Sequence, residues 1–249
     1  MRILFCLVVV LTSASLAFAK RPLSGSGSGS LPLAFGSCED TNLNFFLPVA
    51  DTRPLLPNAV GSPIVTPRFG GDTTSLNIAH FYCGRASIAG RPATAMNFAL
   101  IRLGLKPAGY YVLWVLTDSQ QFHQALRSRG IETQLVSNVS LEIAASMWNT
   151  RWGGSYSPYS VVAHQIIRIA AASGAIDWIF SGSQGLVHVT GSSTLIEEFG
   201  DRTPVVSVPE RSALRPFFDR SRGTTALTHR EVFDLRLNSP VSRAALNDK

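Results

Sequence analysis

The sequence lacks the short motifs that mark several well-known chemistries. It contains no G-x-S-x-G nucleophile elbow, no H-E-x-x-H pair and no glycine-rich phosphate loop, which are signatures of serine hydrolases, zinc proteases and nucleotide hydrolases. Its 5 histidines show no metal-ligand spacing with one another. No internal repeat is visible. The sequence therefore favours none of these activities, and it predicts no metal site.

Long apolar runs are missing after the first residues of the chain. At the start, Arg2 precedes the apolar run Ile3–Leu11, and Ala17-Phe18-Ala19 matches a small-residue cleavage pattern. This arrangement is typical of a secretory signal peptide over residues 1–19, and it is too short to span a membrane. We therefore expect a secreted, extracellular protein with no transmembrane segment. Lys20-Arg21 follows, either as a processing site for a short pro-segment or as two solvated charges.

Charge of either sign is sparse. Charged residues make up 15% of the chain, and 22 Lys and Arg against 16 Asp and Glu give a formal net charge of +6. Loss of Arg2 with the signal peptide lowers this charge by one, and trimming of Lys20 and Arg21 lowers it by two more. The basic residues are scattered rather than clustered, so we expect no nucleic-acid partner.

Cysteine is also scarce, with 3 in the whole chain. Cys6 leaves with the signal peptide, and an even pair in an exported chain, Cys38 and Cys83, favours one disulfide. This bond would tie the N-terminal segment to the middle of the domain. Asn138-Val139-Ser140 is the only N-x-S/T pattern, so Asn138 is the one acceptor for a glycan if the host is eukaryotic.

Strand and helix patterns alternate irregularly along the rest of the chain. Residues 20–30 are a Gly/Ser-rich linker or pro-segment, because Ser24–Ser30 alternates serine with glycine. The folded part begins near Leu31. Apolar patterns predict strands at Asn42–Val49, Tyr110–Leu116, Ala175–Phe180 and Leu186–Thr190. Helical spacing and capping residues predict helices at Ala93–Leu105, after Asp118, after Ser140 and at Thr228–Leu237. Without a regular βαβ order, this mixture indicates an α+β domain.

One stretch carries a family resemblance. Tyr156-Ser157-Pro158-Tyr159, then His164-Gln165-Ile166 and a small-residue turn into Trp178, resemble the catalytic loop of the A chains of cholera toxin and heat-labile enterotoxin. Val49–Pro54, Leu76–Ile78 and Tyr110–Val115 resemble further segments of these proteins in the same order. The resemblance covers roughly residues 42 to 190. It implies an ADP-ribosyltransferase-like split mixed β-sheet fold with surrounding helices over residues 31–192, followed by a C-terminal helical appendage over residues 193–249.

The resemblance also implies positions for the catalytic groups. Breaking the nicotinamide–ribose bond needs carboxylates near a developing positive charge and an arginine for the phosphates of NAD. The family's catalytic positions fall at Val49, Thr94, His164 and Ile166, so the charged groups are replaced. No Asp or Glu lies between Glu142 and Asp177. The remaining positions would form a vestigial cleft, which consists of Asp51, Arg53, Thr94 and Gln165.

These substitutions predict a secreted, toxin-like effector that has lost catalysis. It would act as a pseudoenzyme without cofactor and would bind a host or target protein through a loop that carries Tyr156 and Tyr159, since exposed rigid aromatics are typical of binding surfaces. The tyrosines would otherwise pack against Trp152 and hold the loop shut. The alternatives are an active NAD-dependent mono-ADP-ribosyltransferase with a divergent site, and a structural or cell-wall-associated protein.

Overall fold

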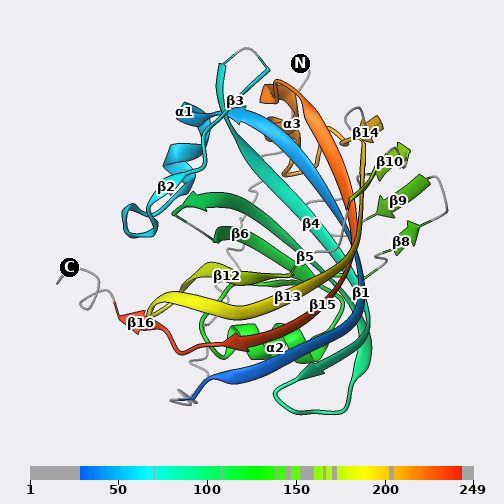
Figure 1. The fold of residues 1–249 in the computed structure, drawn as a ribbon. Helices are drawn as coiled ribbons and strands as arrows, with labels where there is room; N and C mark the ends of the chain where they lie inside the picture. The colour runs from blue at the N-terminus through cyan, green and yellow to red at the C-terminus, as the bar shows by residue number, and fades with distance from the viewer. Residues whose placement is uncertain are drawn as a thin grey trace, which may run out of the picture.

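The structure is a computed structural model that describes the backbone of residues 29–69, 71–107, 109–137, 140–143, 147–151, 160–164, 167–169, 173–201 and 205–242. Strands dominate these residues (Figure 1). Seven long strands pair side by side in the order β5-β4-β1-β15-β13-β12-β6, and β6 pairs again with β5. The sheet therefore closes on itself as a barrel, which leaves these strands without open edges.

The wall of the barrel combines segments from both ends of the chain. Its strands are β1 (Leu31–Pro48), β4 (Gly71–Ile88), β5 (Thr94–Lys106), β6 (Tyr110–Thr117), β12 (Ser173–Gly182), β13 (Gly185–Asp201) and β15 (Thr224–Leu237). Neighbouring strands run antiparallel, except that β6 and β12 are parallel. The first and last of these strands, β1 and β15, lie side by side.

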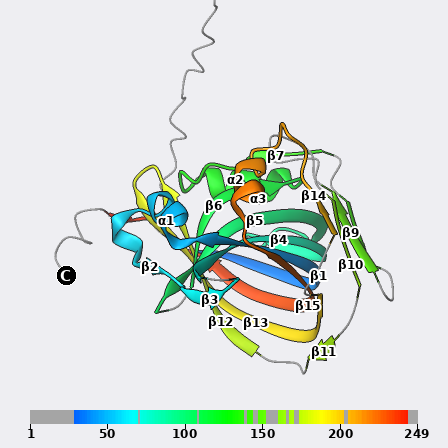
Figure 2. The same cartoon turned by 90° about the horizontal axis from the view of Figure 1, so that it is seen from above.

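Shorter elements surround the wall. Between β1 and β4 lie α1 (Val49–Thr52), η1 (Arg53–Leu55), η2 (Asn58–Val60), β2 (Ser62–Pro63) and β3 (Thr66–Arg68). After β6 follow α2 (Gln120–Arg127) and β7 (Gln134–Leu135). A separate four-stranded sheet consists of β8 (Ser140–Ile143), β9 (Met147–Arg151), β10 (Ser160–His164) and β14 (Val205–Ser207). The others are β11 (Ile167–Ile169), α3 (Arg215–Arg220) and β16 (Val241–Ser242). Viewed from above, the small sheet of β9 and β10 lies outside the wall (Figure 2).

Aromatic side chains fill one half of the barrel interior. Phe81 of β4 and Trp178 of β12, whose strands are not neighbours, approach to 6.1 Å between ring centroids. Phe98 stacks on Phe81 at 4.5 Å, and Phe233 lies 6.0 Å from Trp178. Phe122 of α2 packs on Phe98 at 5.3 Å, so this helix adds to the same cluster. These contacts across the barrel identify the face of each strand that points inward.

The opposite face of the wall is also apolar in places. Phe45 of β1 contacts Phe218 of α3 at 5.8 Å between ring centroids, and Leu56 and Leu214 are buried in the same cluster. Burial on both faces explains why β5 is apolar almost without interruption from Met96 onward. Such strands read as continuous apolar runs rather than alternating ones.

The expected disulfide is present. Cys38 and Cys83 form a bond between β1 and β4, where they lie directly opposite each other. It joins the N-terminal strand to the middle of the chain, as the sequence predicted. Among the described residues, no helix has the length and apolar character needed to cross a membrane.

Several predicted strands are confirmed, whereas most predicted helices are wrong. Tyr110–Leu116 lies in β6, and the segments on both sides of the Ser181–Gly185 turn are β12 and β13. The helix after Asp118 exists as α2, with Ser119 as its cap. However, Ala93–Leu105 is largely strand β5. Its apolar residues fit a helical spacing only because nearly every position is apolar.

The tail of the chain departs furthest from expectation. The segment after Ser140 forms strands β8 and β9 instead of a helix, and Thr228–Leu237 lies in β15. A domain boundary between residues 192 and 193 would cut through β13, which continues to Asp201. The C-terminal segment is therefore part of the barrel wall and not a helical appendage. The expected α+β ADP-ribosyltransferase-like fold is wrong, because these tail strands close the barrel.

Candidate functional site

Polar side chains fill the other half of the barrel interior. Asp40, Asn42 and Asn44 alternate along β1 and share its inward face, because Asp40 lies opposite Phe81 in the pairing with β4. Asp40 and Asn42 are 0% and 3% exposed, and Arg102 of β5 is 8% exposed. Burying polar and charged groups costs free energy that an apolar interior would avoid. Their concentration in one half of the barrel marks it as the candidate site.

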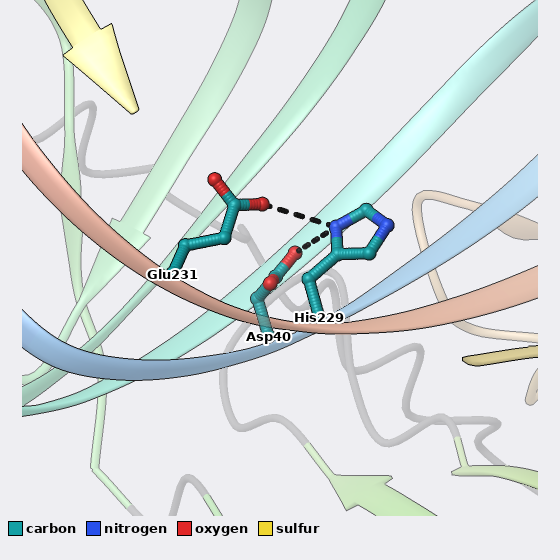
Figure 3. Close-up of side chains that lie close together, drawn as sticks. All are labelled: Asp40, His229 and Glu231. Carbon is teal, nitrogen blue, oxygen red and sulfur yellow. Dashed lines mark ion pairs between the residues drawn. The ribbon is translucent and has the colours of Figure 1, made fainter. Parts of the chain in front are cut away.

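Two carboxylates and an imidazole meet on β1 and β15. Asp40 lies directly opposite His229, and Glu231 is two residues further along the same face of β15. The Nδ1 atom of His229 lies 3.3 Å from Asp40 Oδ2 and 3.1 Å from Glu231 Oε1. Figure 3 shows the three side chains pointing toward one another. This group, the Asp40–His229–Glu231 cluster, combines groups that can exchange protons with groups that can hold a cation.

Burial controls the charge of Asp40. Loss of solvation raises the pKa of its carboxyl above the ordinary value, and the nearby His229 opposes this effect. The Nδ2 amide of Asn42 donates to Asp40 Oδ2 and lies 3.2 Å from His229 Nδ1. The other oxygen of Asp40, Oδ1, is buried and has no hydrogen-bond partner among the described residues.

Arg102 projects from β5 into the same half of the barrel. Its Nε donates to Asn77 Oδ1 at 2.7 Å, and its Nη2 donates to Asn42 Oδ1 at 3.1 Å. The guanidinium carbon lies 4.1 Å from the ring centroid of Tyr110, a distance typical of a cation–π contact. Burial lowers the pKa of Arg102, whereas Tyr110 and the more distant Asp40 and Glu231 oppose this shift. The ordinary pKa of arginine is so high that its guanidinium stays protonated in proteins.

Arg102 has no ion-pair partner in the described part of the chain. The ion pairs found there join other residues, and none of them includes a nitrogen of Arg102. The described residues also provide no hydrogen-bond acceptor for Nη1. The guanidinium therefore has hydrogen-bonding capacity left after its two bonds to neutral amides.

A small cavity opens beside this arginine. Its volume is about 140 Å³. The residues that line it are Asn44, Ile64, Thr66, Thr74, Ser75, Asn77, Gly104 and Tyr110. Asn77 and Tyr110, the two neighbours that hold the Arg102 guanidinium, therefore both form part of the cavity wall. Ser75 and Asn77 also donate to Asn44 Oδ1 at 2.8 and 2.9 Å, so the polar wall is hydrogen-bonded together.

No lysine lies in the described part of the barrel interior. Lys106, the lysine that the structure describes, is exposed at the end of β5. A lysine amine is the group that forms Schiff bases with carbonyl substrates. The interior described here offers arginine, histidine, amide and carboxyl groups in its place.

The residues that the sequence assigned to a nucleotide cleft are not brought together. Arg53 donates to the Gly61 carbonyl oxygen at 2.8 Å, next to β2, which pairs with the Lys106 end of β5. Thr94 is exposed at the other end of that strand. Asp51 and Val49 lie on α1, beside Arg53. Since a strand rises about 3.3 Å per residue, Thr94 is far from Asp51 and Arg53, and the described residues do not form the predicted cleft together.

The remaining predicted positions are not tested. Asn138, Tyr156, Tyr159, Gln165 and Ile166 lie outside the described residues. His164 ends β10, and only its backbone is described. The glycan at Asn138 and the binding loop with Tyr156 and Tyr159 therefore remain predictions from the sequence.

Sequence reasoning missed the residues of the actual polar site, which are Asp40, Asn42, Arg102, His229 and Glu231. A signal for some of them was present. Asp40, Asn42 and Asn44 are polar at every second position, as are His229 and Glu231, which is the period of a strand. The helical interpretation of Thr228–Leu237 separated His229 from Glu231 and hid their common face.

Comparison with known proteins supports the barrel. No protein-family model matches the sequence, and no curated protein matches it. Among solved structures, an acetoacetate decarboxylase matches with a TM-score of 0.57 and 10% identity, over 82% of this chain and 87% of that chain. The acetoacetate decarboxylase of Legionella pneumophila matches with a TM-score of 0.54 and 9% identity, over 84% and 85%. The enduracididine biosynthesis enzyme MppR, complexed with pyruvate, matches with a TM-score of 0.51 and 11% identity, over 84% and 88%.

These matches correct the family resemblance inferred from the sequence. The structural neighbours are barrel proteins and not A chains of the cholera toxin type. The interpretations as an enterotoxin-like pseudoenzyme and as an active ADP-ribosyltransferase toxin are both wrong. At about a tenth sequence identity the similarity concerns the fold alone. The chain has the β-barrel fold found in acetoacetate decarboxylase and MppR.

Proposed function

We propose that the polar half of the barrel binds a small carboxylic acid, with Arg102 as its anchor. The observation that carries this proposal is a buried guanidinium without an ion pair among the described residues. A buried charge is costly unless it is paired. The planar fork of arginine matches a carboxylate through two parallel hydrogen bonds. A carboxylate ligand would supply the missing partner.

The size of the cavity limits the ligand. The volume beside Arg102 is about 140 Å³, and a cavity of about 150 Å³ accommodates benzene. A ligand of roughly six or seven non-hydrogen atoms therefore fits. Pyruvate and acetoacetate are acids of this size, and two of the structural neighbours carry these molecules in their names. Small oxo acids are thus the substrate class that we favour.

The hydrogen bonds of Arg102 leave its Nη1 group available for such an acid. Asn42 lies between Arg102 and Asp40, because its Oδ1 accepts from the arginine and its Nδ2 donates to the carboxylate. Asp40 is therefore separated from the guanidinium by a neutral amide. The other two contacts of the guanidinium are with Asn77 and Tyr110, and both of these residues line the cavity. With no lysine in the described interior, the acid would be held by charge and hydrogen bonds instead of a Schiff base.

Calorimetric titration with pyruvate and pyruvamide tests this proposal. The two ligands have similar size, but only pyruvate carries a carboxylate. We expect saturable binding of pyruvate and at least tenfold weaker binding of pyruvamide, since a hydrogen bond to a charged group contributes about 1.5–3 kcal/mol. Arg102→Gln should weaken pyruvate binding by a similar factor. Arg91→Gln, at an exposed turn after β4, is the matched control and should leave binding unchanged.

Three outcomes would contradict the proposal. They are equal affinity for pyruvate and pyruvamide, unchanged pyruvate affinity in Arg102→Gln, and the absence of binding for every small oxo acid tested at millimolar concentration. The comparison of the two ligands uses the natural chain alone. It therefore remains decisive even if the Arg102 variant fails to fold.

Export is a separate proposal that rests on residues 1–19. Their charged start, apolar run and Ala-Phe-Ala pattern favour a signal peptide. Protein recovered from outside the producing cells should begin after Ala19, as measured by N-terminal sequencing. Accumulation inside the cells with an intact start would overturn this proposal.

For partners, we propose a small molecule inside the barrel, and the site offers no argument for a nucleic acid.

A further inference from the structure

The Asp40–His229–Glu231 cluster brings three potential metal ligands together inside the barrel. One atom from each residue, an imidazole nitrogen and two carboxylate oxygens, lies within 4.8 Å of the others. The Asp40 side chain is 1% exposed, and those of His229 and Glu231 are 14% and 12% exposed. The residues belong to adjacent strands of the wall, so the backbone fixes their relative positions (Figure 3).

Several polar atoms lie close to one ring nitrogen of His229. His229 Nδ1 faces Asp40 Oδ2, Glu231 Oε1 and the Nδ2 amide of Asn42, all within 3.3 Å. A ring nitrogen carries at most one hydrogen. If Nδ1 is protonated, it can donate fully to only one carboxylate, and its hydrogen opposes those of the amide. If Nδ1 is unprotonated, its lone pair faces the oxygens of two acids. A cation among the three acceptor atoms would satisfy all of them at once.

The two distances from His229 to the carboxylates fit a shared cation. Zinc and similar metals bind nitrogen and carboxylate oxygen at about 2.0–2.2 Å. Two ligands of one such ion, at angles between octahedral and tetrahedral, are therefore separated by roughly 3.0–3.5 Å. The Nδ1 atom of His229 lies 3.3 Å from Asp40 Oδ2 and 3.1 Å from Glu231 Oε1, within this range.

A second, independent observation concerns the other oxygen of Asp40. Oδ1 is buried and has no hydrogen-bond partner among the described residues, although a buried carboxylate normally satisfies both oxygens. A metal bound to Asp40 would give this carboxylate a second interaction. The charges agree as well. The two acids of the cluster favour a cation, and the positive charge of Arg102 offsets part of their negative charge.

We infer that Asp40, His229 and Glu231 bind one divalent transition-metal ion. Imidazole and carboxylate ligands suit manganese, iron, cobalt and zinc, and the described cysteines, Cys38 and Cys83, are joined in a disulfide and supply no thiolate. Three protein ligands leave coordination positions open, as in catalytic rather than structural sites. This inference goes beyond the carboxylate ligand proposed above, and neither depends on the other. The histidine spacing in the sequence, by contrast, predicted no metal site.

Titration of untagged, chelator-treated protein with Zn²⁺ alone and with Mn²⁺ alone tests the inference. We expect one ion per chain with micromolar or tighter affinity for Zn²⁺. Asp40→Asn and Glu231→Gln should each weaken Zn²⁺ binding at least tenfold. Asp177→Asn is the matched control, because Asp177 pairs with His188 at 2.9 Å on the neighbouring strands β12 and β13 but has no third ligand there among the described residues. That variant should bind Zn²⁺ as the natural chain does.

A measurement on the natural chain tests the inference even if the variants fail to fold. Bound Mn²⁺ is paramagnetic and should broaden the amide NMR signals near Asp40 on β1 and near His229 and Glu231 on β15 before any others. Broadening centred on His188 or on the exposed surface would overturn the inference. So would a stoichiometry well below one ion per chain, or Zn²⁺ affinity that is the same in the Asp40 and Glu231 variants as in the natural chain.

Discussion

Acid should destabilise the barrel through His80, and burial of this side chain sets the size of the effect. His80 on β4 is 0% exposed, and its Nε2 lies 3.2 Å from Asn97 Oδ1. Burial lowers the pKa of His80 from the ordinary 6.5 to about 3, although the hydrogen bond to Asn97 acts in the opposite direction. The imidazole therefore stays neutral in the folded protein at pH values where the unfolded chain binds a proton.

The sign and magnitude follow from the two pKa values. Stability from the neutral His80 is fully present above pH 6.5 and is lost as the pH falls toward about 3, because only the unfolded chain gains a proton in this window. Each pKa unit corresponds to about 1.36 kcal/mol. Between about pH 7 and about pH 5, the free energy of unfolding should therefore fall by about 2 kcal/mol through this residue. That is a large share of the roughly 5–15 kcal/mol that stabilises a typical domain.

Urea denaturation of the natural chain and of His80→Gln at both pH values measures this loss. Glutamine is polar and does not titrate, so the difference in unfolding free energy between the two proteins isolates the histidine. Between about pH 7 and about pH 5, the free energy of unfolding of the natural chain should fall by about 2 kcal/mol relative to that of His80→Gln. The less buried His123, changed to Gln, should produce a smaller shift. Parallel pH dependence in the natural chain and His80→Gln would refute the reasoning.

Two further predictions concern the packing of the barrel. Phe98→Ala removes a fully buried ring that stacks on Phe81 and should lower the free energy of unfolding by about 3–5 kcal/mol. Tyr82→Ala, at a position that is 39% exposed, should cost less than about 1 kcal/mol, and equal losses in urea denaturation would contradict the assigned inward face. Replacing both Cys38 and Cys83 by alanine opens a loop with a sequence separation of 45 and should cost up to about 4 kcal/mol. An unchanged unfolding midpoint would count against this bond.

The sequence predicted the structure correctly where the local composition allows only one interpretation. Tyr110–Leu116 is uninterrupted by polar residues and is strand β6 in the barrel wall. The pairing of Cys38 with Cys83 followed from counting the cysteines left after an expected signal peptide, and it is present. Both predictions depend on local composition and not on the arrangement of distant segments.

Closure of the barrel was not visible in the sequence, because it depends on pairing between distant strands. Thr228 and Glu231 match a helix capping pattern, yet His229, Glu231 and Phe233 also alternate along one face of a strand. The backbone of this segment hydrogen-bonds with β1 and β13, and this tertiary pairing overrides the local pattern. The α+β expectation failed for this reason.

The polar site was hidden by the same long-range pairing. Asn42 and His229 approach to 3.2 Å across a sequence separation of 187, and Arg102 reaches Asn42 from a third strand. No spacing within one segment relates these residues. Only the pairing of these distant strands brings the Asp40–His229–Glu231 cluster and the guanidinium of Arg102 into contact with the same residue, Asn42.

The most direct test of the carboxylate site is an NMR titration that follows the guanidinium of Arg102 itself. Its Nε–H signal can be assigned by its loss in Arg102→Gln. Addition of pyruvate should shift this signal in a saturable way, with the same dissociation constant that calorimetry gives, while pyruvamide should leave it nearly unchanged. Shifts confined to exposed arginines such as Arg91, with the Arg102 signal unmoved at saturating pyruvate, would contradict a carboxylate site inside the barrel.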